Sequence, residues 1–315
     1  MPRDRARRHR RERDDQRPPC QRSHRGEVVG LMLGTLLPVD SFTVVALVAT
    51  FVIVAIGLHF TLGLLGVVNM VHGEFILIGA YVTYQVQDWS GSPTWGFVIA
   101  PFVAGLFGAF VELVLVRRLY LRPLDTLLVT FGLSLIIRQG VQLIYSPNPK
   151  QVDDPIGGSF IVAGYNVPWW RLTVVIAAIV LVVAWLLFDR TTIGLRWRAA
   201  VRNPELAEAM GYSVRSARTW LFGIGCATAG LAGAMLAPIN TLTPQYGLRF
   251  LVNSFLVVIL GKPGSLKGLA IAAVVLGGSL GVMQFHVSTV YAQMIMLVIA
   301  VVAARLRPLV TAKRG

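Results

Sequence analysis

Three polar side chains that can bind a small molecule lie close together in an otherwise apolar part of the chain. Asn69, His72 and Glu74 occupy a segment that starts at Gly66 and contains Gly73. Polar and ionisable groups at membrane depth are costly, and they usually face a cavity or one another. The segment can therefore line a passage for a polar molecule. It can also be a connection at the membrane surface, where Asn69 caps a helix and Glu74 complements the helix dipole. The two roles are compatible.

The histidine and the carboxylate of this segment do not complete a metal or catalytic motif. His72-Gly73-Glu74 matches the H-x-E half of the zinc-deaminase signature, but the P-C-x-x-C half is absent. The five histidines are scattered along the chain, and the sequence places no Ser or Cys beside His72. We therefore expect neither a metal site nor an enzyme.

A single cation, Arg138, lies inside the apolar run 124–145. It is seven residues from the outer end of that run, about 10 Å deep at 1.5 Å per residue. Its side chain can extend to the outer interface. Alternatively, it provides a positive charge for an anionic group that passes through the membrane. Both interpretations stay open at this point.

A second informative segment, 203–211, has the signals of a short helix with defined ends. Asn203 suits the N-cap, Pro204 the first helical position, Glu205 the first turn, and Gly211 the position just after the helix. Such a helix is too short to be stable alone, so we expect it to dock on a partner. The side expected to dock is apolar and consists of Leu206, Ala209 and Met210. Ala207 lies on the same helix.

The composition requires these residues to be held by membrane-spanning helices. The chain has 315 residues, of which 55% are hydrophobic and 14% charged, with a mean hydropathy of +0.66. A soluble domain carries about 25% charged residues, so we expect an integral membrane protein. Lipid offers no partner for backbone groups, which predicts an all-α polytopic fold. Eight or nine spans are expected, the seventh and eighth forming a broken pair: 42–65, 67–87, 95–116, 124–145, 170–188, 219–239, 246–261, 268–285 and 289–304.

Basic residues predict the orientation of these spans. Lysine and arginine concentrate in loops 117–123 and 189–218, at the break 262–267 and at the C-terminus, whereas loops 88–94, 146–168 and 240–247 are nearly free of them. The first group is therefore expected on the cytoplasmic side. We divide the chain into a basic tail (1–27), a membrane domain (28–309) that includes loop 189–218, and a cytoplasmic tail (310–315).

The basic tail does not fit this orientation, because ten arginines precede a span that should start outside. The tail crosses the membrane, or residues 28–40 form an extra half-helix, or the tail is not native. We hypothesise that translation starts near Val28, Val29 or Met32. The tail contains no aromatic residue, so we expect a solvated segment and no nucleic-acid partner.

A weak internal repeat is also visible in the glycine spacing. Gly66 and Gly73 are seven residues apart, as are Gly261 and Gly268, and each pair lies between two apolar helices. Broken helices at corresponding places of two halves are typical of transport pathways.

Taken together, these motifs resemble the LivH-type permease of branched-chain amino-acid ABC importers. The similarity extends from about Val44 to Leu309. The family's N-x-x-H-G-E motif is similar to Asn69, His72, Gly73 and Glu74 here, and its cytoplasmic coupling loop is similar to Thr191, Gly194, Arg198, Ala199, Ala207 and Gly211.

The resemblance implies a pore-forming subunit in the bacterial inner membrane, surrounded by lipid and paired with a second, LivM-like permease. It also implies two cytoplasmic ATPase subunits that bind ATP and Mg, and an extracytoplasmic binding protein. This chain has no G-x-x-x-x-G-K-[ST] motif and is expected to bind no cofactor itself.

The sequence leaves the substrate open, because urea and short-chain amide permeases share much of this pattern. An ion-coupled secondary transporter, the alternative from another class, would need deep carboxylates. We expect Glu74 to be shallow, near the cytoplasmic mouth.

Overall fold

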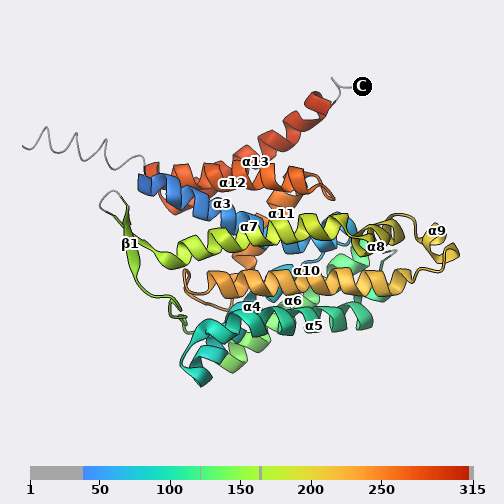
Figure 1. Ribbon diagram of the computed structural model, residues 1–315, viewed down its shortest axis with the longest axis horizontal. Helices are drawn as coiled ribbons and strands as arrows, with labels where there is room; N and C mark the ends of the chain where they lie inside the picture. The colour runs from blue at the N-terminus through green and yellow to red at the C-terminus, as the bar shows by residue number, and fades with distance from the viewer. Residues whose placement is uncertain (1–37, 121, 163–164, 312–315) are drawn as a thin grey trace, which may run out of the picture.

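Long apolar helices running along one common direction make up most of the computed structural model, which describes residues 38–120, 122–162 and 165–311 (Figure 1). The long helices are α3 (Pro38–Leu58), α4 (His72–Ser90), α5 (Gly96–Val114), α6 (Pro123–Tyr145), α7 (Trp169–Arg190), α10 (Val214–Leu236), α11 (Tyr246–Gly261), α12 (Leu266–His286) and α13 (Thr289–Thr311). Each of the nine expected segments therefore lies mostly in a helix.

Within the described residues, six helical segments are long and apolar enough to cross a membrane, which makes the chain a multi-pass membrane protein. They are Phe42–Leu64, Pro93–Arg118, Pro123–Tyr145, Trp169–Arg190, Val214–Leu236 and Leu266–His286. Short elements extend or connect them: η1 (His59–Leu64), η2 (Pro93–Trp95), η3 (Val116–Arg118), α8 (Thr192–Arg202) and α9 (Pro204–Ala209).

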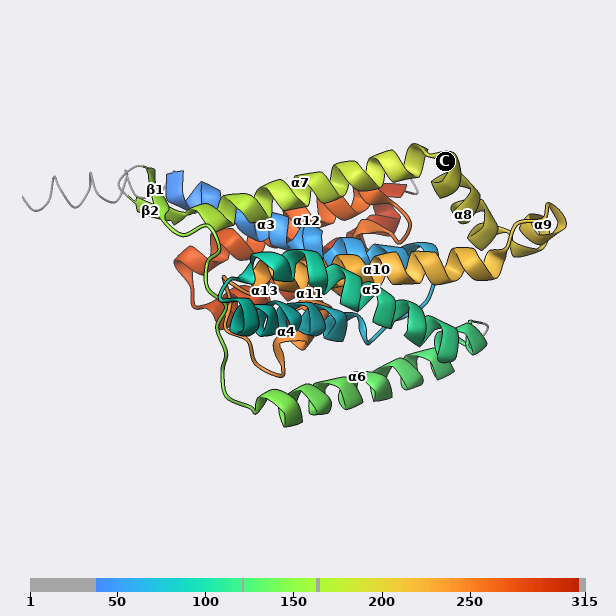
Figure 2. The same ribbon diagram turned by 60° about the horizontal axis from the view of Figure 1, so that its bottom comes forward.

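The connection between α6 and α7 contains a β-hairpin, which an all-helical prediction omits. Strands β1 (Ser159–Val162) and β2 (Tyr165–Pro168) pair antiparallel in the connection between α6 and α7. This hairpin lies at one end of the helices, and α8 and α9 lie at the other (Figure 2). We call these the hairpin end and the α8–α9 end.

Basic residues collect at the α8–α9 end. The α5–α6 connection contains Arg117, Arg118 and Arg122, and the α11–α12 connection lies between Lys262 and Lys267. Both connections and the C-terminal helix end reach the side of the molecule that carries α8 and α9 (Figures 1 and 2). The expected basic loops are thus brought to one end. The tail 1–27 and the possible start sites lie outside the described residues, as does the half-helix 28–40 except for its last three residues.

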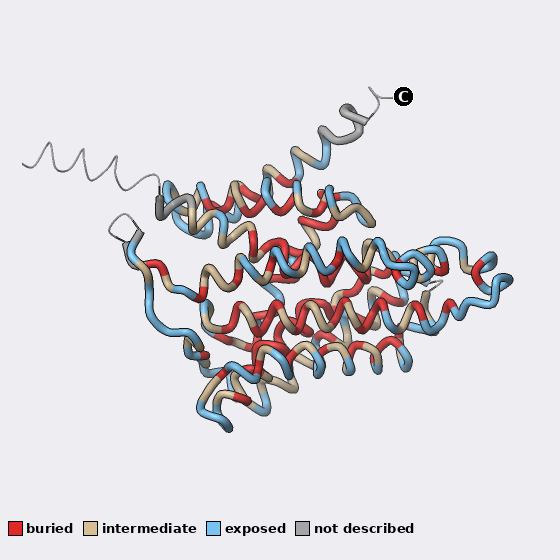
Figure 3. The backbone as a smooth tube through the Cα atoms, viewed as in Figure 1, coloured by how far each residue is buried: buried red, intermediate tan, exposed pale blue. Residues whose placement is uncertain are grey.

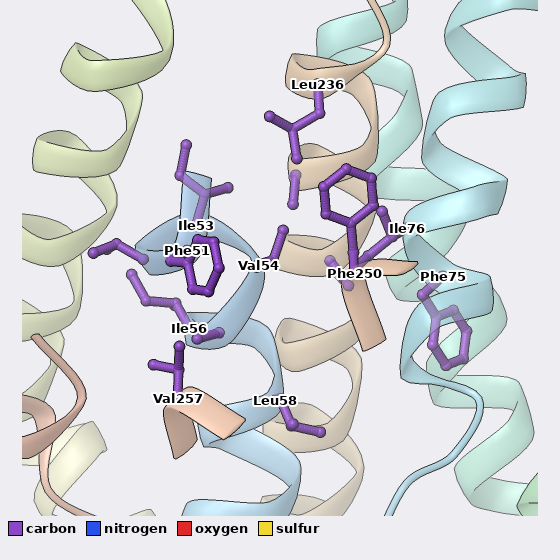
Figure 4. Close-up of a cluster of buried hydrophobic side chains, with 14 of the residues drawn as sticks. Phe51, Ile53, Val54, Ile56, Leu58, Phe75, Ile76, Leu236, Phe250 and Val257 are labelled. Atoms are coloured by element: carbon purple, nitrogen blue, oxygen red, sulfur yellow. The ribbon is translucent and has the colours of Figure 1, made fainter. Parts of the chain in front are cut away.

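Helix α3 is the central helix of the bundle. It contacts α7, α10, α11 and α12, and all of its residues from Phe51 to Leu58 are buried. Its apolar side chains belong to the same buried cluster as Phe75 and Ile76 of α4 and Phe250 of α11 (Figure 4). Buried residues concentrate on the inner helices, and exposed ones on the outer faces (Figure 3). Because lipid solvates apolar side chains, exposed apolar faces on α5, α6 and α7 fit a membrane position.

Glycines set the close packing of α10 on its neighbours. A Cβ atom added at Gly230 would overlap Ala104 of α5, and one added at Gly233 would overlap the Ile76 carbonyl of α4. Small residues at such contacts let helix backbones approach closely, which is how membrane helices gain packing energy. Helix α10 thereby joins α4 and α5 to α3.

Candidate functional site

The polar segment identified in the sequence turns back into the molecule before α4 begins. Helix α3 continues through the π-helical turn η1 to Leu64, the chain then runs without helical structure through residue 69, and α4 starts at His72. The Asn69 side chain accepts a hydrogen bond from the Val71 N–H (3.1 Å), which forms an Asx-type turn. The N-cap position is Val71, so the expected role of Asn69 as the N-cap is wrong, although its side chain does fix the turn.

His72 is fully buried where three helices meet. Its Nε2 bonds the backbone carbonyl of Val54 on α3 (3.0 Å), and the Ser254 hydroxyl of α11 donates to the same carbonyl (3.2 Å). Val54 lies ten residues before Leu64, roughly 15 Å along the helix. The re-entrant segment therefore carries the start of α4 back inside the bundle, whereas the sequence analysis expected a shallow site near one mouth.

Glu74 forms a buried ion pair with Arg138. The Arg138 Nη2 lies 2.7 Å from Glu74 Oε1, with 0% of the glutamate side chain and 19% of the arginine side chain exposed. Ser134 donates to the same carboxylate oxygen (3.0 Å) and accepts from Arg138 (3.2 Å). The structure thus brings together two residues that the sequence presented separately. Arg138 does not extend alone to the interface; it bonds α6 to the first turn of α4.

Helix α6 contacts the bundle through a polar stripe as well as through apolar side chains such as Ile137 and Tyr145. Four residues spaced by four, namely Thr126, Thr130, Ser134 and Arg138, form a stripe along it; the first three are buried. Thr130 accepts from the Met70 N–H (3.3 Å), directly before α4. Sequence analysis missed Ser134 and Thr130, although a polar stripe with a period of four in an apolar span was the available signal.

Two helices begin at this centre and run in opposite directions. Helix α4 leads toward the hairpin end and α11 toward the α8–α9 end (Figure 2). At the meeting point, a Cβ added at Gly247 would overlap the Gly73 carbonyl, and one added at Gly73 would overlap the Gly247 carbonyl. Glycine is required at both positions for this approach. The positive ends of two helix dipoles therefore lie close together inside the bundle.

The two glycine pairs of the repeat suggested by the sequence make different contacts in the structure. Gly73, at the start of α4, packs on Gly247 at the start of α11, whereas Gly261 packs on Gly268 across the tight α11–α12 connection. Gly66 adopts a positive φ of 69° with no atom near its Cβ position. The partner of Gly73 in space is therefore the start of α11.

Several polar atoms of the centre have no partner among the residues that the structure describes. They are Asn69 Nδ2, His72 Nδ1, Glu74 Oε2 and Arg138 Nε, together with the Tyr81 and Tyr246 hydroxyls. Unsatisfied polar groups are costly in an apolar interior. These atoms can bind water or a polar molecule that enters the bundle, which is what a passage for a hydrophilic solute needs.

The expected coupling loop consists of two helices rather than one. Sequence analysis missed α8, whose start is built by the motif residues Thr191, Gly194 and Arg198. Thr191 Oγ1 caps the helix at the Gly194 N–H (3.0 Å), and Arg198 pairs with Asp189 (2.7 Å). A side chain at Gly194 would overlap the Phe188 carbonyl. The three residues together fix the sharp turn from α7 into α8.

Helix α9 ends as the sequence predicts. Gly211 has a φ of +80°, and its N–H bonds the Glu208 carbonyl (3.0 Å), while the Tyr212 N–H bonds the Ala207 carbonyl (2.9 Å). This pair of bonds is a Schellman motif, which favours glycine at the left-handed position. Pro204 is the first helical residue as expected.

The start of α9 and the exposure of its apolar side differ from what the sequence predicts. Asn203 occupies the N-cap position, but its side chain makes no capping bond. Leu206, Ala209 and Met210 are exposed, while Ala207 is buried against α8 and α10 in the small cluster around Ala200. The apolar side that was expected to dock is therefore uncovered in this chain.

A polar cluster at the same end ties α10 to the α5–α6 connection. Buried Glu112 accepts from the hydroxyls of Thr219 (2.6 Å) and Tyr120 (3.3 Å), and it lies 3.7 Å from Arg117. Burial and the neighbouring Glu112 carboxylate raise the pKa of Tyr120 well above its usual value, so its hydroxyl stays protonated and donates. The sequence places Glu112 one turn from Arg117, at the interface, but it gives no sign of the bond to Thr219, which is 107 residues away.

Comparison with known proteins places these features in a family context. The family model described as "Branched-chain amino acid transport system / permease component" matches residues 41–304. The chain is 25% identical over 285 residues to the high-affinity branched-chain amino acid transport system permease protein LivH of Escherichia coli K12, which covers 85% of the chain and 92% of that protein.

Two further relatives extend the comparison. The probable branched-chain amino acid transport permease protein LivH of Methanocaldococcus jannaschii is 23% identical, covering 82% of the chain and 86% of its own length. The high-affinity branched-chain amino acid transport system permease protein LivM of Escherichia coli K12 is 26% identical, covering 74% of the chain and 61% of its own length. No solved structure matches the chain significantly.

Proposed function

We propose that this chain, which belongs to the family of branched-chain amino acid transport permeases, forms one half of the translocation pathway of an ATP-driven importer for branched-chain or related amino acids. The observation that carries the proposal is the family match over residues 41–304, which includes both the buried polar centre and the α8–α9 segment. The likeness to both LivH and LivM supports a second, related permease as its partner. Two ATPase subunits and an extracytoplasmic binding protein complete the complex.

The proposed orientation places the α8–α9 end in the cytoplasm of a bacterial inner membrane. Basic residues concentrate at that end, as the positive-inside rule requires. The long helices then make eight or nine crossing segments, according to whether α11 and α12 count separately. In this orientation the hairpin end faces the binding protein, and α9 faces the ATPase.

The pathway is proposed to pass the centre formed by Asn69, His72, Gly73, Glu74 and Arg138. The first two have unpaired polar atoms there, and two helix starts meet at Gly73. The Glu74–Arg138 pair has a positioning role in this proposal, because it holds α6 against the start of α4.

ATP binding on the partner subunits is proposed to act on this chain through α9. The exposed apolar side of α9 is too small to hold the helix without a docking surface. Movement of the ATPases would carry α9, and with it α8 and α10, whose end is bonded to the α5–α6 connection through Glu112. That connection offers a route from the ATPases to the pathway helices.

The substrate is tested by uptake into proteoliposomes that contain the complete complex. Labelled leucine, urea and ribose are supplied separately with the cognate binding protein and internal ATP. Accumulation of leucine, with neither urea nor ribose taken up, is the expected result. Accumulation of urea without leucine would assign the chain to an amide permease instead.

A further inference from the structure

An open groove of about 870 Å3 lies between α11, α13 and the segment 239–245 that leads into α11. Among the described residues, its lining includes one cation, Arg249. Amide and hydroxyl side chains also line it, and the other lining residues are Tyr246 and apolar side chains, most of them on α11 and α13; the polar ones are Asn240, Thr241, Thr243, Gln245, Asn253 and Gln293. Small-molecule sites commonly have volumes of about 300–1,000 Å3 and combine an apolar lining with a few polar groups. The groove has both properties.

In the proposed orientation, Arg249 lies within the depth of the bilayer rather than at its edge. Helix α11 begins at the centre of the bundle, where Gly247 touches Gly73, and Arg249 is twelve residues before its end at Gly261, roughly 18 Å away. The hydrocarbon core is about 30 Å thick. A charged side chain at such depth faces a water-filled cavity or another protein surface, not lipid.

The charge of Arg249 is not compensated within the described part of the chain. Arg138 and Arg198 each bind a carboxylate at 2.7 Å, whereas Arg249 has no ion pair or hydrogen bond among these residues. The Tyr246 side chain lines the same groove and is only 4% exposed, yet its hydroxyl also has no partner there. The groove therefore presents an uncompensated cation, beside a tyrosine whose buried hydroxyl has no partner among the described residues.

The groups of the groove match the chemistry of an amphipathic amino acid. The guanidinium of Arg249 and the positive end of α11 favour a carboxylate. The amide oxygens of Gln245 and Asn253 can accept from an ammonium group. Leu248 and Val252, which are 42% and 50% exposed, offer contacts to an aliphatic side chain.

We propose that this groove is the wall that the chain contributes to the outer half of the pathway, and that Arg249 binds the carboxylate of the amino acid in transit. This inference rests on the proposed function. It assigns to Arg249 the role that the sequence suggested for Arg138, which is instead bonded to Glu74. The second permease closes the open side of the groove, because a surface with this cation at bilayer depth needs a protein or water neighbour.

The first test compares charge variants in the reconstituted complex. Arg249→Gln should lower the maximal rate of labelled leucine uptake at least tenfold, without changing the KM for the loaded binding protein. Arg249→Lys should retain at least a third of the rate, since it keeps the charge. Arg305→Gln removes a charge from the exposed far part of α13 and is the matched control, with a rate expected to equal that of the unmodified complex.

The second test restores the charge on a folded protein. Arg249→Cys is prepared in a background with Cys20→Ser and Cys226→Ala, and it is treated with 2-aminoethyl methanethiosulfonate or with neutral methyl methanethiosulfonate. The first reagent adds a cation and should raise uptake at least fivefold, while the second should leave it low. Equal effects of the two reagents would overturn the inference.

The outcomes separate the inference from the function on which it rests. If the unmodified complex imports leucine and Arg249→Gln imports it at the same rate, the inference fails and the function stands. If the unmodified complex imports no branched-chain amino acid, the proposed function fails and the inference with it. A third outcome is that Arg249→Gln does not assemble with the second permease and the aminoethyl adduct gives no recovery of uptake. Arg249 would then be an interface residue, and the inference would also be overturned.

Discussion

Replacing Arg138 by Gln tests whether the buried ion pair holds α6 against the start of α4. The substitution leaves the Glu74 carboxylate, of which 0% is exposed, with the Ser134 hydroxyl as its remaining hydrogen-bond donor among the described residues. Removing one partner of a buried ion pair costs about 3–5 kcal/mol. A glutamine amide can restore about 1 kcal/mol through one neutral hydrogen bond. We therefore expect a loss of about 2–4 kcal/mol in the free energy of unfolding.

The assay is denaturant unfolding of the purified chain in mild detergent, followed by tryptophan fluorescence. The double variant Glu74→Gln with Arg138→Gln removes both charges, so it should be more stable than the sum of the single effects predicts, by about 1–3 kcal/mol. Arg122→Gln, at the residue directly before the same helix, is the matched control. Its pair with Asp125 is 3.7 Å apart and exposed, so no measurable change is expected.

Two results would refute this reasoning. One is a change below about 0.5 kcal/mol for Arg138→Gln, which is within the range of ordinary surface substitutions. The other is strict additivity of the two single variants, which would mean that Glu74 and Arg138 do not interact energetically. Either result would remove the positioning role that we assign to the pair.

Three further predictions concern transport. His72→Ala removes the bond to the Val54 carbonyl and should lower leucine uptake at least tenfold while the complex still assembles, as measured by size-exclusion chromatography. Leu206→Asp changes a side chain that is 55% exposed, so it should leave unfolding unchanged but abolish ATP-driven uptake. Gly211→Val forces a β-branched residue to a φ of +80° and should destabilise the end of α9 by about 1–2 kcal/mol and reduce uptake; Gly211→Asn should reduce it less.

Each of these predictions has a control and a contradicting result. Glu208→Gln, an exposed neighbour on α9, should transport normally beside Leu206→Asp. Unmodified uptake by an assembled complex with Leu206→Asp would mean that α9 is not the coupling element, and the α5–α6 connection would become the next candidate. Normal uptake by His72→Ala at equal abundance would leave His72 a packing role only. Equal uptake by Gly211→Val and Gly211→Asn would show that backbone strain is unimportant.

The sequence predicted the helical segments well because apolar runs of about 20 residues report directly on membrane helices. Segment 124–145 corresponds to α6 at Pro123–Tyr145, and 170–188 corresponds to α7 at Trp169–Arg190. The span expected from residue 67 instead begins at His72, because the preceding residues re-enter the bundle. Hydropathy cannot distinguish re-entrant backbone from helix when both are apolar.

The residues of the centre were found in the sequence, but their contacts were not. Glu74 and Arg138 are 64 positions apart, and a single sequence contains no record of which distant residues touch. The end of α9 was predictable because the Schellman motif is local and needs only Gly211 and its neighbours. The sequence analysis gave Arg249 no role, because 246–261 reads as the apolar first half of a broken pair. The start of α11 inside the bundle depends on the contact between Gly247 and Gly73, which a single sequence does not show.

The central claim is that this chain carries amino acids across a membrane at the expense of ATP hydrolysed by partner subunits. It is tested most directly by labelled leucine uptake into proteoliposomes that hold both permeases and the ATPases, with the loaded binding protein outside. Accumulation above the external concentration with internal ATP, and its loss when the ATPase cannot hydrolyse ATP, is the predicted result. Leucine uptake that is equal with and without ATP, or that follows an ion gradient, would contradict the account.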